Sequence, residues 1–250
     1  MTNPREVLTL IDNIRLIHSD EQRRDLLRSL ERVDRPTILS FVNVHAVNLC
    51  WSSAAACDAF RASDVLLRDG IGLSVAFKAL DIRPGLNMNG TDFIPLLLQT
   101  LPKRRLAVYG TATPWLERAR IHLENTTPHI IADMLHGFHP TERYLESARR
   151  HRPDVIVLAM GMPRQEEVAI ALRGALGGPC LIVCGGAILD FLGGKATRAP
   201  LWMRRAGLEW AFRLAVEPKR LWKRYSKIVP RFAIGFGKQL LDTKLGRDRA

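Results

Sequence analysis

The amino-acid sequence predicts an α/β fold, in which a mostly parallel sheet carries helices on both faces. The first observation behind this prediction is a regular alternation of short apolar runs with helical spans along the chain. The second is the stretch 154–200, where two apolar runs flank a helical span as in one βαβ unit. The third is that six apolar runs are each followed directly by a polar residue or glycine: Asn43, Asp69, Gly110, Gly137, Gly161 and Gly185.

The expected strands are short and mostly apolar. We expect strands at residues 37–42, 64–67, 105–109, 129–135, 154–160 and 179–184. Residues 7–16 alternate weakly and are expected to form a strand pair broken at Asp12-Asn13.

Helices are expected between these strands, several with a start signal. Ser19-Asp20-Glu21-Gln22 has the spacing of a capping box, and its helix should end near Val33. Thr91 or Asp92 can cap a helix that begins at Gly90. The remaining helices are expected at residues 45–62, 71–80, 115–124, 141–150 and after Gly161.

Charge divides the chain into two parts. The 250 residues carry a formal net charge of +12, and residues 195–250 contribute +11 of it, from 15 Lys+Arg and 4 Asp+Glu. We therefore expect an α/β core over residues 1–195 and a basic helical appendage over residues 196–250. A tail of this charge favours an anionic partner, such as a lipid surface, nucleic acid or a phosphorylated substrate.

The appendage also holds three of the five tryptophans. Pro218 and Pro230 should divide it into short helices. Basic amphipathic helices with aromatic residues are typical of membrane interfaces, so we expect attachment to an anionic membrane surface. The alternative is a packed helical pair with a solvated basic face. The expected apolar anchors are Trp222, Tyr225, Phe232 and Phe236.

The four cysteines, Cys50, Cys57, Cys180 and Cys184, form no Cys-x-x-Cys pair and have no histidine at metal-ligand spacing. They are expected to be small buried residues in a reducing compartment. No signal peptide is recognisable and no apolar run approaches the ~20 residues of a spanning helix. We therefore expect a cytoplasmic protein that attaches peripherally to the membrane.

The residues after the strand ends are the candidate site. In a parallel sheet these positions share one edge, so Asn43, Asp69 and Gln165 could converge on one cleft. Glycines there let the backbone approach a ligand, and helix N-termini favour anions. Asp69-Gly70 fits an ordinary turn equally well.

Several motifs together resemble the WecG/TagA/CpsF glycosyltransferases, glycosyltransferase family 26. Their order and spacing cover roughly residues 40–225. The matching residues are Asn43, Asp69-Gly70, Gly72, Gly90-Thr91-Asp92-Phe93, Gly161-Met162-Pro163-Arg164-Gln165-Glu166, Gly185-Gly186-Ala187-Ile188-Leu189-Asp190-Phe191, Gly194, Arg198-Ala199-Pro200, Gly207-Leu208-Glu209-Trp210, Arg213-Leu214, Glu217-Pro218 and Arg220.

The resemblance implies a Rossmann-like core and an appendage that completes the active site at the membrane. It implies an inverting transfer of a hexosyl or N-acetylhexosaminyl group from a UDP-sugar to a polyprenyl-diphosphate-linked saccharide, in bacterial surface or exopolysaccharide synthesis. Membership would place the protein on the inner face of the cytoplasmic membrane.

Roles for individual residues follow from the resemblance. Asp69 matches the proposed catalytic base, and Asn43 and Gln165 match residues that line the pocket. The further expected substrate-binding residues are Gly90, Asp92, Gly161, Pro163, Glu166, Gly185, Gly186, Asp190 and Arg198.

No cofactor or metal ion is expected. The sequence lacks the Asp-x-Asp motif with which metal-dependent transferases hold a cation on the diphosphate. Arg213, Arg220 and Arg224 can neutralise the diphosphate through charge-assisted hydrogen bonds instead.

Two positions depart from the family pattern. Phe41 stands where the pattern has Thr, and Asn87 stands where it has Arg. The identity of the transferred sugar and of the acceptor saccharide therefore stays open.

Two other classes of protein fit the sequence less well. A dinucleotide-dependent oxidoreductase should carry Gly-x-Gly-x-x-Gly in its first βα turn, whereas this turn is Asn43-Val44-His45-Ala46-Val47-Asn48. A basic-tailed nucleic-acid-binding α/β protein would explain the charge but not the polar residues of the neutral body, so no nucleic-acid partner is expected. A homo-oligomer is compatible with the sequence.

Overall fold

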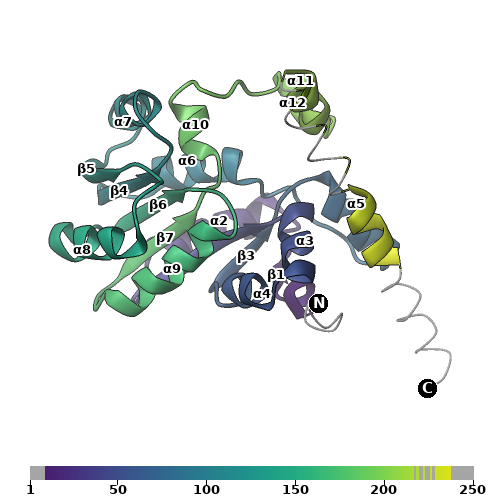
Figure 1. Cartoon of the computed structure of the whole chain (residues 1–250), viewed down its shortest axis with the longest axis horizontal. Coiled ribbons are helices and arrows are strands. Elements are labelled where there is room, and N and C mark those ends of the chain that lie inside the picture. The colour runs from purple at the N-terminus through teal and green to yellow at the C-terminus, as the bar shows by residue number, and fades with distance from the viewer. Residues whose placement is uncertain (1–8, 217, 220–221, 223–225, 227–228, 238–250) are drawn as a thin grey trace.

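A single parallel sheet forms the centre of the molecule (Figure 1). The computed structural model describes residues 9–216, 218–219, 222, 226 and 229–237. Within these residues the sheet has seven strands in the order β1-β3-β2-β7-β6-β4-β5, all parallel. The strands are β1 (Ile14–Arg15), β2 (Pro36–Val42), β3 (Val65–Arg68), β4 (Arg105–Gly110), β5 (Ile130–Leu135), β6 (Val155–Ala159) and β7 (Cys180–Cys184). The predicted α/β, Rossmann-like fold is confirmed.

Helices cover both faces of this sheet, as predicted. They are α2 (Asp20–Glu31), α3 (Val44–Ser52), α4 (Ala54–Arg61), α5 (Ile71–Ala79), α6 (Gly90–Thr100), α7 (Trp115–Thr126), α8 (Thr141–His151), α9 (Arg164–Ala175), α10 (Ile188–Leu192), α11 (Leu201–Arg205) and α12 (Glu209–Val216). Leu39 and Phe41 of β2 pack in one cluster with α2, α6, α7 and α10. Ile38 and Val42 face the opposite way, toward clusters built from α3, α4, α5, α8 and α9. Alternating strand residues therefore serve two apolar layers.

Two of the expected elements differ from the structure. The single helix expected over residues 45–62 is divided into α3 and α4, because Ser53 is extended and its hydroxyl accepts the Ala56 N–H at 3.2 Å. The strand pair expected over residues 7–16 is also wrong. Residues 9–12 are helical, and Ile14–Arg15 pair with β3.

The C-terminal segment packs on the body in part. Residues 229–237 are helical, and the rings of Trp51 and Phe232 lie 5.9 Å apart between centroids. Phe236 is buried and packs in the cluster of α3 and α4. Its expected role as a lipid anchor is therefore wrong, whereas Trp202 and Trp222 are about two-thirds exposed, at 65% and 66%. Tyr225 lies outside the described residues.

No helix in the described part of the chain is long and apolar enough to cross a membrane. The four cysteines are buried, as predicted, and none forms a disulfide within the described residues.

Candidate active site

A cavity of about 420 Å³ opens at the carboxyl ends of the strands. Open α/β sheets bind their ligands at this edge. Its lining comes from the ends of β2, β6 and β7, from the segments that follow β2 to β7, and from one residue of α12. The predicted site residues in the lining are Asn43, Asp69, Gly90, Gly161, Gln165, Gly185, Gly186, Asp190 and Arg213. The predicted convergence of Asn43, Asp69 and Gln165 on one cleft is confirmed.

Asn43 is held by the start of α3. Its Oδ1 accepts the backbone N–H groups of His45 at 2.9 Å and Ala46 at 3.1 Å, which is the geometry of a helix N-cap. This arrangement leaves its amide NH₂ free to donate to Asp69, with 3.2 Å between Nδ2 and Oδ2. The helix cap thus orients a hydrogen-bond donor at the carboxylate.

Asp69 follows β3 and is partly buried at the cavity wall. Burial raises the pKa of its carboxyl above the ordinary value, while the Asn43 hydrogen bond and the charge of Arg213 act in the opposite direction. A carboxylate with a raised pKa is suited to accept a proton.

The loop beside Asp69 is fixed by the preceding residue. The Arg68 guanidinium is buried and donates to the carbonyls of Pro84 at 2.8 Å, Gly70 at 2.8 Å and Gly85 at 3.1 Å. Asn87, which stands where the family pattern has Arg, accepts the Gly70 N–H at 2.8 Å. Asn87 therefore supports the turn that carries Asp69.

The opposite wall is built around Gln165 of α9, which is fully buried. Its Oε1 accepts the Gly186 N–H at 2.8 Å, and its Nε2 donates to Glu166 Oε1 at 2.8 Å. Burial raises the pKa of Glu166 to about 8, so this carboxyl is mostly neutral near pH 7. Gln165 thereby ties α9 to the glycine turn after β7.

A polar corner closes the cavity beside α10. Thr111 donates to Asp190 Oδ1 at 2.5 Å, and Lys195 Nζ lies 3.1 Å from the same oxygen. A side chain at Gly185 would lie 2.6 Å from Ile188, so the turn requires glycine. Bare backbone and a hydrogen-bonded carboxylate are thus available to a ligand.

Arg213 comes from α12, in the predicted appendage. Its guanidinium lies over the Phe191 ring, 4.7 Å from the centroid, and it lines the cavity. The appendage therefore contributes a cation to a cavity that the body otherwise builds.

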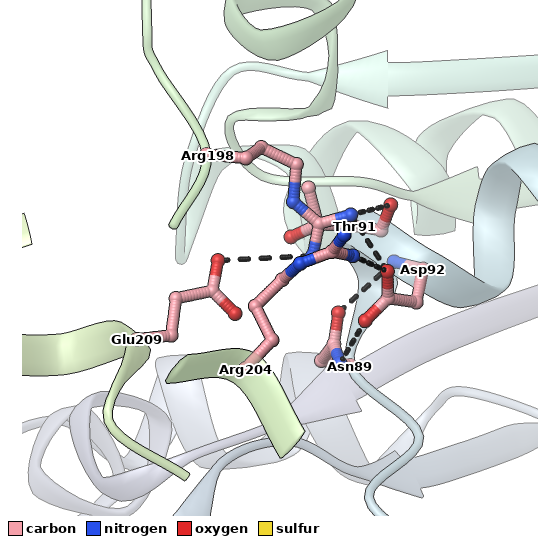
Figure 2. A network of polar contacts seen from close by, with 6 residues as sticks. All are labelled: Asn89, Thr91, Asp92, Arg198, Arg204 and Glu209. Carbon is pink, nitrogen blue, oxygen red and sulfur yellow. Dashed lines mark hydrogen bonds and ion pairs between the residues drawn. The ribbon is translucent and has the colours of Figure 1, made fainter. Parts of the chain in front are cut away.

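Other predicted site residues lie elsewhere. The lining does not include Pro163, Glu166, Asp92 or Arg198. Glu166 is buried behind Gln165, and Asp92 and Arg198 bind each other at 2.6 Å (Figure 2). Arg220 and Arg224 lie outside the described residues, so their role stays a prediction.

The sequence alone assigned no ligand role to several lining residues: His45, Thr111, Phe138, Phe191 and Lys195. Phe41, noted only as a departure from the family pattern, also lines the cavity. Thr111 and Phe138 follow the strand-end glycines Gly110 and Gly137, so extending the same rule by one residue would have found them. Phe41 is buried and packs edge-on against Phe93, with 6.3 Å between centroids. Among the described residues, no group of three or more His, Cys, Asp or Glu side chains is placed to hold a metal ion.

A Rossmann-like body with a polar cavity at its strand ends, lined in part by an arginine of α12, suits a glycosyl transferase. The chain belongs to the WecG/TagA/CpsF glycosyl transferase family, whose model matches residues 9–246.

Two curated relatives carry the same name, N-acetylglucosaminyldiphosphoundecaprenol N-acetyl-beta-D-mannosaminyltransferase. The one from Bacillus subtilis strain 168 is 31% identical over 182 residues, covering 71% of this chain and 70% of the relative. The one from Staphylococcus aureus strain NCTC 8325 / PS 47 is 22% identical over 219 residues, covering 86% and 82%.

Proposed function

We propose that this protein transfers a sugar from a UDP-sugar to a polyprenyl-diphosphate-linked saccharide, with inversion at the anomeric carbon. The observation that carries the proposal is the partly buried Asp69 in the cavity, oriented by Asn43 and faced by Arg213. The names of the two relatives support an N-acetylhexosaminyl group as the sugar and an undecaprenyl-diphosphate-linked acceptor.

Asp69 acts as the base in a single displacement. The acceptor hydroxyl oxygen attacks the anomeric carbon, its proton passes to the Asp69 carboxylate, and the bond from that carbon to the β-phosphate oxygen breaks. UDP leaves with the electron pair of that bond. The raised pKa of Asp69 favours its acceptance of the proton.

Negative charge grows on the leaving diphosphate and needs a cation. Arg213 lines the cavity, and we assign it this role together with Arg220 and Arg224 of the same appendage. No metal ion is required in this scheme. The glycine turn at Gly185-Gly186 and the Asp190 carboxylate offer a cradle for the donor nucleotide.

The lipid-linked acceptor calls for a site at a membrane. The basic segment 196–250 bears exposed Trp202, Trp210 and Trp222, which suit the interface of an anionic bilayer. We propose that the segment after residue 195 attaches peripherally to the inner face of the cytoplasmic membrane, where the product would enter surface or exopolysaccharide synthesis.

The test is a transfer assay with a panel of UDP-sugars, with UDP-N-acetylmannosamine first, and a short-chain polyprenyl-diphosphate-linked N-acetylglucosamine acceptor. Mass spectrometry should detect an acceptor that is heavier by one sugar residue. A mobility-shift assay with DNA and RNA runs beside it. Tight binding of nucleic acid with no transfer from any UDP-sugar would contradict the proposal and favour the nucleic-acid-binding alternative.

A further inference from the structure

One carboxylate joins the body to the appendage. Asp92, in the first turn of α6, accepts hydrogen bonds at Oδ1 from Arg198 at 2.6 Å and from Arg204 of α11 at 2.9 Å (Figure 2). Its Oδ2 accepts from Asn89 at 2.9 Å. Arg198 also pairs with Glu209, the first residue of α12, at 3.8 Å. We call Asp92, Arg198, Arg204 and Glu209 the ionic latch.

The latch depends on Asp92 more than on any other member. Arg198 and Arg204 share this one carboxylate oxygen. Arg198 Nε and NH2 and Arg204 Nε are buried and have no hydrogen-bond acceptor in the part of the chain that the structure describes. Without Asp92, two guanidinium groups would face each other with the more distant Glu209 as counter-charge. Burial alone would raise the pKa of Asp92, but hydrogen bonds from Arg198 and Asn89 outweigh it and lower the pKa. The carboxylate is therefore charged at neutral pH.

Helix α12 connects the ionic latch to Arg213, because it carries both Glu209 and Arg213. Glu209 and Arg213 are four residues apart on this helix and thus lie on one face. Arg213 lies over Phe191, and its positive charge acts against the larger effect of burial, which raises the pKa of Asp69. The position of α11 and α12 on α6 thus sets where the cavity cation lies.

We propose that Asp92 is a positioning residue, which acts through Arg198 and Arg204 to dock α11 and α12 and so hold Arg213 over the cavity. This role differs from the substrate contact that the family resemblance suggested, and it rests on the proposed transfer reaction. Asp92 and Arg198 are 106 positions apart in sequence, so the latch is a contact between distant parts of the chain.

A double-mutant cycle tests whether Asp92 acts through Arg213. Asp92→Ala should lower kcat about 10- to 100-fold while the KM for the UDP-sugar changes less than about twofold. Adding Asp92→Ala to Arg213→Ala should lower kcat by less than about twofold further, because the positioned group is already gone. Multiplicative losses in the double variant, or a loss of UDP binding in Asp92→Ala, would overturn the proposal.

Two further variants separate docking from folding. Arg204→Ala removes one arm of the latch and leaves the Asn89 contact of Asp92 intact, so it should lower kcat in the same direction without disturbing α6. Asp25→Ala is the matched control, since it breaks an exposed Asp–Arg pair of the same 2.6 Å length on α2. It should leave kcat unchanged.

Hydrogen exchange of α11 and α12 provides a readout that needs no transfer. Their amides should exchange faster in Asp92→Ala and Arg204→Ala than in wild type and in Asp25→Ala. Unchanged exchange in both latch variants would contradict the docking role. If wild type transfers no sugar, the proposed function fails, while this exchange result still decides whether the latch docks the helices.

Discussion

The side-chain NH₂ group of Asn43 donates a hydrogen bond to Asp69, with 3.2 Å between Nδ2 and Oδ2, while the side-chain oxygen Oδ1 of Asn43 caps α3. The two residues are 26 positions apart in sequence and lie at the ends of the neighbouring strands β2 and β3. Since the cap holds the side-chain oxygen at α3, the NH₂ group is directed to the Asp69 carboxylate. The residue that caps α3 thus also orients the carboxylate that is proposed to act as the base.

The first prediction concerns the pH dependence of transfer. Asp69 must lose its proton to act as a base, so kcat/KM should rise with pH through the raised pKa of Asp69. Asn43→Ala and Arg213→Ala each remove a group that stabilises the Asp69 carboxylate. In both variants the rise of kcat/KM with pH should therefore be shifted to higher pH. Arg28→Ala, an exposed arginine on α2, is the control. If kcat/KM rises at the same pH in wild type and in both cavity variants, the ionisation of Asp69 does not control the rate.

The second prediction concerns stability. The folded protein holds the Asp69 proton more tightly than the unfolded chain, so the stabilisation from this group is complete below its ordinary pKa of 3.8 and is lost as pH rises through the folded value. Asp69→Asn carries no charge and should raise the Tm at neutral pH relative to wild type. The gain should disappear when both proteins are melted near pH 3. A lower Tm for the variant at pH 7 would contradict the assigned pKa shift.

The third prediction concerns metal ions. Because arginines are assigned to the diphosphate, transfer should persist after the protein and substrates are treated with EDTA. The rate before and after chelation, and after adding back magnesium or manganese, provides the comparison. A strict requirement for either ion would show that the diphosphate is neutralised differently.

The fourth prediction concerns the membrane. Changing both Trp202 and Trp222 to Ala should weaken pelleting with anionic liposomes by at least about tenfold, since burying one large apolar side chain contributes about 1.5–3 kcal/mol. Ile121→Ala on α7, at a side chain 51% exposed, should leave pelleting unchanged. Equal pelleting of all three proteins would place the membrane contact elsewhere.

The residues that directly follow the strands are the part of the site that the sequence predicted well. A parallel sheet brings its carboxyl ends to one edge whatever the details, so Asn43, Asp69 and Gly185 could be placed together from local patterns alone. The motif resemblance added Arg213, whose position on a short helix of the appendage has no local signature.

Long-range polar contacts could not be predicted in this way. Asp92 and Arg198 each resemble a ligand-binding residue when taken alone, and their mutual contact appears once the chain is folded. Phe236 shows the same limit for apolar residues. An amphipathic pattern marks an apolar face but does not reveal whether a bilayer or Trp51 covers it.

The most direct test of Asp69 as the catalytic base is the rate of sugar transfer by Asp69→Asn at saturating UDP-sugar and acceptor. Turnover should be ~100- to 10,000-fold lower than in wild type, because a positioned base is lost. The fold, measured by circular dichroism, and the affinity for UDP should be retained. Near-normal turnover would remove Asp69 from the mechanism, and with it the proposal that transfer takes place in this cavity.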